Sequence, residues 1–275
     1  MKKVRWYVTL LLCLVILFAA CGSEEKGGTL KMTILDTGKS DCIVIEAGER
    51  VVVNDTADAD DGGAICAFLD ERQIKRIDYL ILSHFDKDHI GSAARLLTGY
   101  EVGQVLMPDY EEDSEPYVLL MEALVETDTA YARLRKAVSF SLEGVDFYVN
   151  APEQPAYDND NNYSLITTVT NGNNRFLLMG DAKKKRTEEF LDSPMAKERY
   201  DLIKMPHHGD YNKKLEELFE TARPRYAVLT ADPQRMQVEE ETVALLEEWG
   251  CEAYYTDEGM VTVTSDGQRV QISQP

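Results

Sequence analysis

Residues 83–91 read Ser83-His84-Phe85-Asp86-Lys87-Asp88-His89-Ile90-Gly91. Four of these side chains are of types that bind metal ions: His84, Asp86, Asp88 and His89. An apolar run over residues 77–82 precedes them and predicts a buried strand, and residues 93–97 follow with helical spacing. The stretch therefore predicts a strand-to-helix turn, where a loop carries chemistry on a rigid scaffold.

The residue types in this turn favour a metal site. Imidazole nitrogens combined with carboxylate oxygens suit zinc, manganese or iron better than a cage of oxygens alone would. The alternative is a charged turn whose aspartates cap the next helix. Capping explains one or two of the four residues, but it does not explain two histidines that flank two aspartates, so we favour the metal interpretation.

The N-terminal residues have the pattern of an export signal. Lys2, Lys3 and Arg5 form a basic start, and residues 8–20 are almost unbroken apolar sequence. Residues 19–23 resemble a bacterial lipobox, which implies a lipid on Cys21. An uncleaved membrane helix is the alternative, although the run is shorter than the roughly 20 residues that a span needs.

Both interpretations place the rest of the chain outside the cytoplasm, tethered to the cell membrane. We predict a signal peptide over residues 1–20, a lipid-anchored flexible tether over 21–28, and one domain over 29–275. The expected protein is thus an extracytoplasmic lipoprotein whose membrane partner is reached through Cys21. No protein partner is predicted.

Composition limits the function. The formal net charge is -20, which argues against a broad, sequence-independent grip on nucleic acid and against close contact with anionic lipid. Cys42, Cys66 and Cys251 do not make a disulfide framework. We expect Cys42 and Cys66 to pack as small hydrophobic residues.

The periodicity of the chain predicts an α+β fold. Strands are expected over residues 30–35, 42–46, 51–53, 77–82, 102–107, 138–140, 145–149, 165–170, 175–179, 202–205, 226–230, 252–255, 260–264 and 269–272. Helices are expected over residues 64–72, 115–125, 183–191, 215–219 and 238–249. Two mixed sheets packed together, with helices outside, would bury both inner faces, so we predict an αββα sandwich.

Three further strands end in polar residues that can act as ligands. These endings are residues 36–38, which begin with Asp36, residues 180–181, which contain Asp181, and residues 207–209, which contain His207 and His208. All four histidines of the chain lie in residues 207–208 or in the first turn, which scattered core histidines would not do. Taken singly, Asp181 could cap the next helix and one of the paired histidines could be a packed imidazole.

Together these stretches resemble the metallo-β-lactamase superfamily, whose signature is His-x-His-x-Asp-His. More closely, the chain is similar to the hydrolase domain of ComEC-type competence proteins and their stand-alone relatives. The resemblance covers nearly all of residues 30–272. The matching stretches are residues 36–41, 55–56, 77–91, 162–165, 178–181 and 202–209.

The resemblance implies a site with two divalent ions, zinc or alternatively manganese or iron. His84 and Asp86 would hold one ion, Asp88 and His89 the other, and Asp181 would bridge them. The last ligand is His207 or His208. We favour His208, since it precedes the glycine, and His207 would then face the substrate or support a metal ligand.

One expected ligand is missing. The superfamily normally supplies a histidine between the first cluster and the bridging aspartate, whereas Asn162 and Ser164 occupy that region here. The ion at His84 and Asp86 is therefore expected to be the less completely held of the two.

The function implied is a phosphodiesterase or nuclease-like hydrolase that uses a metal-activated hydroxide. Asp88 and His207 are the candidate catalytic residues, and the substrate would be an anion or ester, with DNA as one candidate. The candidate substrate-binding residues are Asp36, Lys39, Asp41, Asn162, Ser164 and Lys204. The alternatives are an esterase of a cell-wall or small-molecule (phospho)ester, such as a phosphocholine-type esterase, and a non-catalytic metal-binding lipoprotein. The acidity of the chain favours the esterase over a DNA-gripping nuclease.

Overall fold

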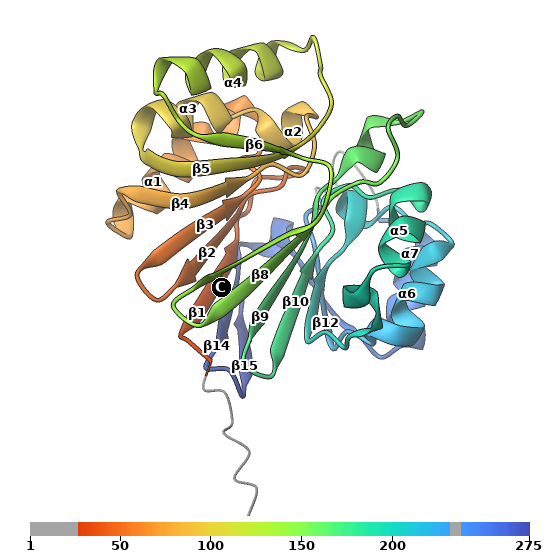
Figure 1. Ribbon diagram of the computed structural model, residues 1–275. Coiled ribbons are helices and arrows are strands. Elements are labelled where there is room, and N and C mark those ends of the chain that lie inside the picture. Colours follow the sequence, from red (N-terminus) through yellow and green to blue (C-terminus); the bar gives the residue numbers. More distant parts are fainter. Residues whose placement is uncertain (1–26, 232–237) are drawn as a thin grey trace, which may run out of the picture.

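Two β-sheets lie face to face in the computed structural model, which describes residues 27–231 and 238–275 (Figure 1). The predicted signal peptide, Cys21 and most of the tether lie outside the described residues. One sheet has eight strands, in the order β15-β14-β1-β2-β3-β4-β5-β6, and the other has seven, in the order β13-β12-β11-β10-β9-β8-β7.

The strand bounds are as follows. The eight-stranded sheet contains β1 (Leu30–Ile34), β2 (Ile43–Ala47), β3 (Arg50–Asn54), β4 (Arg76–Ile81), β5 (Glu101–Pro108), β6 (Tyr131–Leu134), β14 (Val261–Ser265) and β15 (Val270–Ser273). The seven-stranded sheet contains β7 (Val138–Leu142), β8 (Val145–Asn150), β9 (Ile166–Asn171), β10 (Asn174–Leu178), β11 (Leu202–Lys204), β12 (Tyr226–Leu229) and β13 (Glu252–Tyr255).

Helices cover the outer face of each sheet. They are α1 (Gly62–Glu71), α2 (Lys87–Ile90), α3 (Ala93–Gly99), α4 (Glu115–Glu126), α5 (Lys184–Leu191), α6 (Lys214–Ala222) and α7 (Glu240–Glu248). Helices α1, α3 and α4 pack on the eight-stranded sheet, and α5, α6 and α7 pack on the seven-stranded sheet (Figure 1). The αββα sandwich predicted from the sequence is confirmed.

Strand β3 shows why these sequences form a sandwich. Val51 and Val53 pack against the helices, whereas Val52 packs between the two sheets. Side chains alternate between the faces of a strand, and both faces are covered here, so the strand is apolar throughout. The layer between the sheets includes Met32 of β1 and Phe176 of β10.

Each sheet combines antiparallel and parallel strands. Strands β3 to β6 run parallel in one sheet, and β10 to β13 run parallel in the other. The carboxyl ends of parallel neighbours meet at one edge of a sheet, which is where ligands bind in open sheets of this kind. The polar stretches that follow β4, β10 and β11 are therefore brought together.

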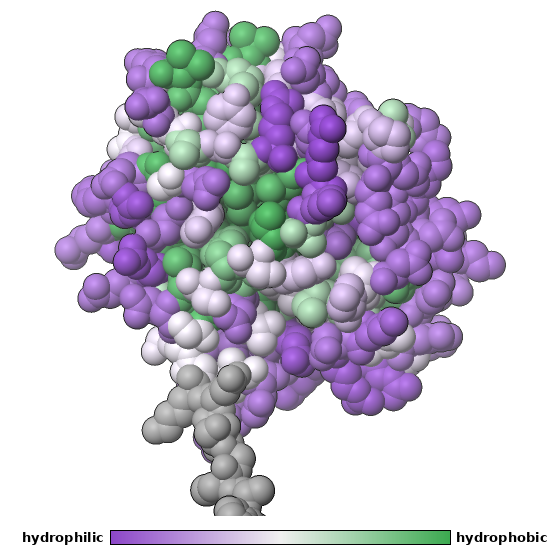
Figure 2. Space-filling model, in the orientation of Figure 1, coloured by the Kyte–Doolittle hydropathy of each residue, from purple (hydrophilic) through white to green (hydrophobic). Residues whose placement is uncertain are grey.

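The visible surface is largely hydrophilic, with apolar side chains over α4 and in the middle of this face, between the two sheets (Figure 2). Val118, Leu119 and Val125 of this helix are exposed. No described helix has the length and apolar character needed to cross a membrane. Cys42, Cys66 and Cys251 are free thiols.

Gly180 is required where β10 meets the turn after β4. Its φ is +53°, and an added Cβ would lie 2.8 Å from the Cβ of Ser83. Both the backbone conformation and the close approach exclude a larger residue. This contact sets the position of Asp181 relative to His84.

Gly180→Ala should lower the free energy of unfolding by about 1–3 kcal/mol, because alanine is strained at positive φ and overlaps Ser83. Urea denaturation measures the change. The control is Gly63→Ala in α1, where nothing lies within 4 Å of the added Cβ. It should leave stability unchanged or raise it by up to about 1 kcal/mol. Equal effects of the two substitutions would contradict the proposed close contact.

Candidate metal centre

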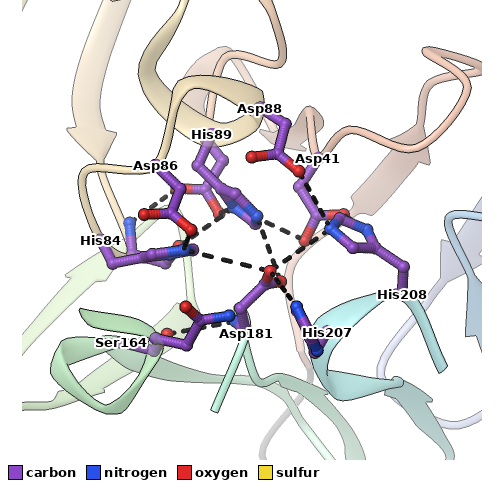
Figure 3. Close-up of polar contacts among 12 residues, drawn as sticks. Asp41, His84, Asp86, Asp88, His89, Ser164, Asp181, His207 and His208 are labelled. Atoms are coloured by element: carbon purple, nitrogen blue, oxygen red, sulfur yellow. Dashed lines mark hydrogen bonds and ion pairs between the residues drawn. The ribbon is translucent and has the colours of Figure 1, made fainter. Parts of the chain in front are cut away.

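The polar strand ends converge at one edge of the sandwich (Figure 3). His84 follows β4, and Asp88 and His89 lie on the short helix α2. Asp181 follows β10, and His208 lies in the turn Pro206–Gly209 after β11. Four segments of sequence are thus needed to build the site, counting the loop between β1 and β2 that carries Asp41.

One group of four residues could hold a metal ion. The ligand atoms of Asp88, His89, Asp181 and His208 all lie within 4.8 Å of one another. His89 Nε2 is 3.1 Å from Asp181 Oδ1, and His208 Nε2 is 3.3 Å from Asp181 Oδ2. His208 Nε2 is also 3.4 Å from Asp88 Oδ2. These are the residues that the sequence predicts for one of the two ions.

The other predicted group is less complete. His84 Nε2 lies 3.5 Å from Asp86 Oδ2 and 4.0 Å from Asp181 Oδ2. The Asp86 side chain is 43% exposed, whereas His84 is fully buried. Asp181 therefore lies between the two groups, as a bridging ligand would.

The buried atoms of this cluster lack hydrogen-bond partners. His84 Nε2, His89 Nε2, His208 Nε2 and Asp181 Oδ1 are buried, and none has a hydrogen bond within the described residues. Although His89 Nε2 and Asp181 Oδ1 are 3.1 Å apart, their geometry is not that of a hydrogen bond. A buried polar atom without a partner costs about 1–3 kcal/mol. Several such atoms around one carboxylate fit a divalent cation.

The opposite nitrogen of each imidazole is anchored. His84 Nδ1 lies 3.0 Å from Ser83 Oγ, and His89 Nδ1 lies 3.0 Å from Asp55 Oδ2. His208 Nδ1 lies 2.9 Å from Thr230 Oγ1. Such anchors fix the ring and leave Nε2 free, as they do for histidines that bind metals.

Hydrogen bonds join Asp55 and Thr56 to the turn that carries His84 and His89. The Ser83 amide donates to Asp55 Oδ1 over 2.6 Å, and the Thr56 amide donates to the His89 carbonyl over 2.7 Å. The end of β3 is thus hydrogen-bonded to both ends of the turn.

The charges at the site shift its pKa values. Burial disfavours the charged form of both histidines and would lower their pKa values. Asp181 and Asp55 nevertheless raise the pKa of His89 well above its ordinary value. Asp181 and the neighbouring carboxylates likewise raise the pKa of His208 to about 10. His208 and His89 in turn hold the pKa of Asp181 well below its ordinary range despite its burial. Burial also tends to raise the pKa of Asp88, but His208 and His89 lower it to about 2.

Two predicted substrate residues are buried instead. Lys204 Nζ is fully buried and pairs with the Asp41 carboxylate. Asp41 Oδ1 also accepts a 2.6 Å hydrogen bond from Thr230 Oγ1. The prediction that Asp41 and Lys204 contact substrate is therefore corrected: they support His208 from behind, through Thr230.

Two further substrate predictions are corrected in the same way. Ser164 is buried, and its Oγ accepts a 3.1 Å hydrogen bond from the Asp181 amide. Asn162 is buried, and its Oδ1 accepts a 3.1 Å hydrogen bond from the amide of Arg186. Ser164 thus positions the backbone at Asp181, and Asn162 positions the first turn of α5, which follows it. Asp36 is exposed and Lys39 is partly exposed, so these two stay candidates for substrate contact.

His207 also reaches the centre. Its Nε2 lies 3.7 Å from Asp181 Oδ2, and its Nδ1 contacts the Asp210 carboxylate. The site predictions missed Ser83, Asp55 and Thr230. Asp55 and Ser83 lie in stretches that resemble the superfamily, residues 55–56 and 77–91, and this resemblance was the signal that could have found them. Thr230, which directly follows β12, carried no such signal.

The model of the metallo-β-lactamase superfamily matches residues 35–231. The chain belongs to the metallo-β-lactamase superfamily. This superfamily usually binds divalent metals, in agreement with the His and Asp cluster described above.

Among the curated relatives of this superfamily member is competence protein ComA of Neisseria gonorrhoeae, which is 24% identical over 207 residues, 73% of this chain and 27% of that protein. ComE operon protein 3 of Bacillus subtilis (strain 168) is 29% identical over 164 residues, which are 60% of this chain and 21% of that protein. Recombination protein 2 of Haemophilus influenzae is 26% identical over 227 residues, which are 81% of this chain and 26% of that protein. The chain thus spans about a quarter of the length of these relatives.

Solved structures share the metallo-β-lactamase fold. YhfI from Bacillus subtilis matches with a TM-score of 0.55 and 11% identity, over 82% of this chain and 96% of that one. Tm1679, described as a metal-dependent hydrolase, also matches with a TM-score of 0.55 and 11% identity, over 90% of this chain and all of that one. At this identity the likeness is one of fold.

Metal uptake should release protons. Since the pKa of His208 is about 10 in the metal-free protein, its ring is charged at pH 7, and an ion must displace that proton. The affinity for Zn²⁺ should therefore rise with pH between about 7 and 10. Calorimetric titrations in two buffers of different ionisation enthalpy count the protons released. An observed enthalpy that does not depend on the buffer would contradict the prediction.

Proposed function

We propose that this chain is a metal-dependent hydrolase of phosphate esters, with phosphodiesters as the preferred class. The observation that carries the proposal is the set of buried, unpartnered Nε2 atoms around Asp181. A divalent cation held by Asp88, His89, Asp181 and His208 would supply Lewis-acid activation of water and of an ester oxygen. Side chains at the rim of the site would orient the water and bind the substrate.

Asp88 is suited to hold the attacking water. Its pKa of about 2 keeps it ionised at neutral pH, and its side chain is partly exposed, unlike that of Asp181. An ionised carboxylate at this position accepts a hydrogen bond from water and orients it.

A cavity beside the centre supports an anionic substrate. It has a volume of about 250 Å³ and is lined by Ala182, Lys183, Lys184, His207, Asp210, Tyr211 and Asn212. Within the described residues, neither Lys183 nor Lys184 forms a salt bridge. Lys183 and Lys39 contribute, after His207, to lowering the pKa of Asp210, so Lys39 also lies close to this cavity.

The lysines at this cavity favour an anionic substrate despite the acidity of the whole chain. The net charge of -20 weakens a broad grip on nucleic acid, but it does not prevent lysines at the mouth of a site from binding one phosphate group. The competence and recombination proteins among the relatives support DNA as a candidate substrate. A phosphocholine-type ester is the second candidate, because it carries the same phosphodiester group.

We further propose that the enzyme acts outside the cytoplasm, anchored by a lipid on Cys21. The apolar run over residues 8–20 and the lipobox-like residues 19–23 support this placement.

Lys183→Met and Lys184→Met should each weaken phosphodiester hydrolysis. For bis-para-nitrophenyl phosphate, we expect kcat/KM to fall about tenfold, which corresponds to about 1.4 kcal/mol of lost binding. The same variants should leave hydrolysis of the neutral ester para-nitrophenyl acetate unchanged. Lys197→Met, at an exposed position on a turn away from the cavity, is the control.

Asp181→Ala should abolish both reactions and lower the metal content. The proposal fails if no phosphodiester, including single-stranded DNA, is hydrolysed with zinc, manganese or iron. Equal losses for the charged and the neutral ester in the lysine variants would leave a metal-dependent hydrolase but contradict the anionic substrate.

A further inference from the structure

We infer that His207 is the missing ligand of the second metal position, so that His207 and His208 serve one ion each. The inference rests on the proposed metal-dependent function. It concerns the group formed by His84, Asp86 and Asp181, which offers only three ligand side chains. No histidine lies between His89 and His207 in the sequence, so the usual source of a fourth ligand is absent.

The distances place His207 at that group. His207 Nε2 is 3.7 Å from Asp181 Oδ2, and His84 Nε2 is 4.0 Å from the same oxygen. Figure 3 shows the His207 and His84 rings both directed at the Asp181 carboxylate. His208 Nε2 lies nearer still to this oxygen, at 3.3 Å, but it belongs to the group with Asp88 and His89. His207 is therefore the imidazole left to join His84 beside Asp181.

The backbone of the turn makes this arrangement possible. His207 has φ 47° and ψ 47°, and His208 has φ 58° and ψ 11°, so both residues are left-handed. Each such residue costs on the order of 1–3 kcal/mol unless the surroundings enforce it. The His207 amide donates to the Gly180 carbonyl over 3.1 Å, which fixes the turn beside Asp181. The result is that two consecutive imidazoles reach one carboxylate, whereas consecutive side chains of a strand point apart.

The other nitrogen of His207 lies against a carboxylate. Its Nδ1 forms an ion-pair contact with Asp210, whereas the contact of His89 Nδ1 with Asp55 is a hydrogen bond. A carboxylate on Nδ1 orients the ring and directs the lone pair of Nε2 toward a metal. The side chain of His207 is only 16% exposed, so most of the ring is turned into the site.

The residues in the place of the usual ligand are already engaged. Asn162 Oδ1 accepts from the Arg186 amide, and Ser164 Oγ accepts from the Asp181 amide. Their hydrogen bonds serve the backbone, which leaves His207 as the described imidazole available to complete the group.

The test is metal stoichiometry. Purified protein is loaded with Mn²⁺, desalted and analysed for metal content, and its paramagnetic resonance spectrum is recorded. The native chain should hold two ions with the multiline spectrum of a coupled pair. His207→Gln should hold one ion with a single-ion spectrum. His207→Cys keeps a ligand atom and should retain a second ion when loaded with Zn²⁺, while circular dichroism checks that both variants are folded.

The outcomes separate the two proposals. If His207→Gln keeps two ions and only activity falls, His207 acts on the substrate and the inference is wrong, although the hydrolase proposal stands. A native chain that holds one ion also overturns the inference. If the native chain binds no ion, the proposed metal-dependent function itself fails.

Discussion

The carboxylate of Asp41 joins the two sheets at the edge where the metal centre lies. Asp41 belongs to the loop between β1 and β2 of one sheet, and it pairs with Lys204 of β11 in the other. Thr230, which follows β12, donates to the same carboxylate. A buried ionised carboxylate is costly without such partners, so this pairing determines how the ends of the strands meet.

The same reasoning explains why the site needs a cation. Asp55 and Asp181 are as deeply buried as Asp41, and Lys204 is already occupied by Asp41. Imidazolium groups neutralise the remaining charge in the metal-free protein, as the raised pKa values of His89 and His208 indicate. A divalent ion would replace those protons and also satisfy the unpartnered nitrogen atoms. In each of these rings, Nδ1 is therefore hydrogen-bonded to the protein and Nε2 is left to bind the ion.

The sequence was sufficient for the fold and for the residues that meet at Asp181. The fold and the site were predicted from local patterns, namely long apolar runs, polar strand ends and a dense cluster of histidine and aspartate. These patterns do not depend on how distant parts of the chain pack. Strand β6 was not predicted, because only Leu134 of its four residues is buried and its pattern gives no clear alternation. It is recognised only by its pairing with β5.

Sequence alone could not separate residues that contact substrate from residues that support the site. Lys204 and Lys183 both lie close to a ligand in the sequence, yet one is buried against Asp41 and the other lines a cavity. The difference depends on the packing of one sheet against the other, which no local pattern records. For the same reason Thr230 gave no signal, since a threonine at the end of a strand is common.

The central claim is that a divalent ion is held by Asp88, His89, Asp181 and His208. Anomalous diffraction from crystals grown with Zn²⁺, recorded on both sides of the zinc absorption edge, tests it most directly. The account predicts a peak about 2.0–2.2 Å from His89 Nε2, His208 Nε2 and a carboxylate oxygen of Asp181. The absence of a peak among these atoms, or a zinc ion held only by other residues, would contradict the account.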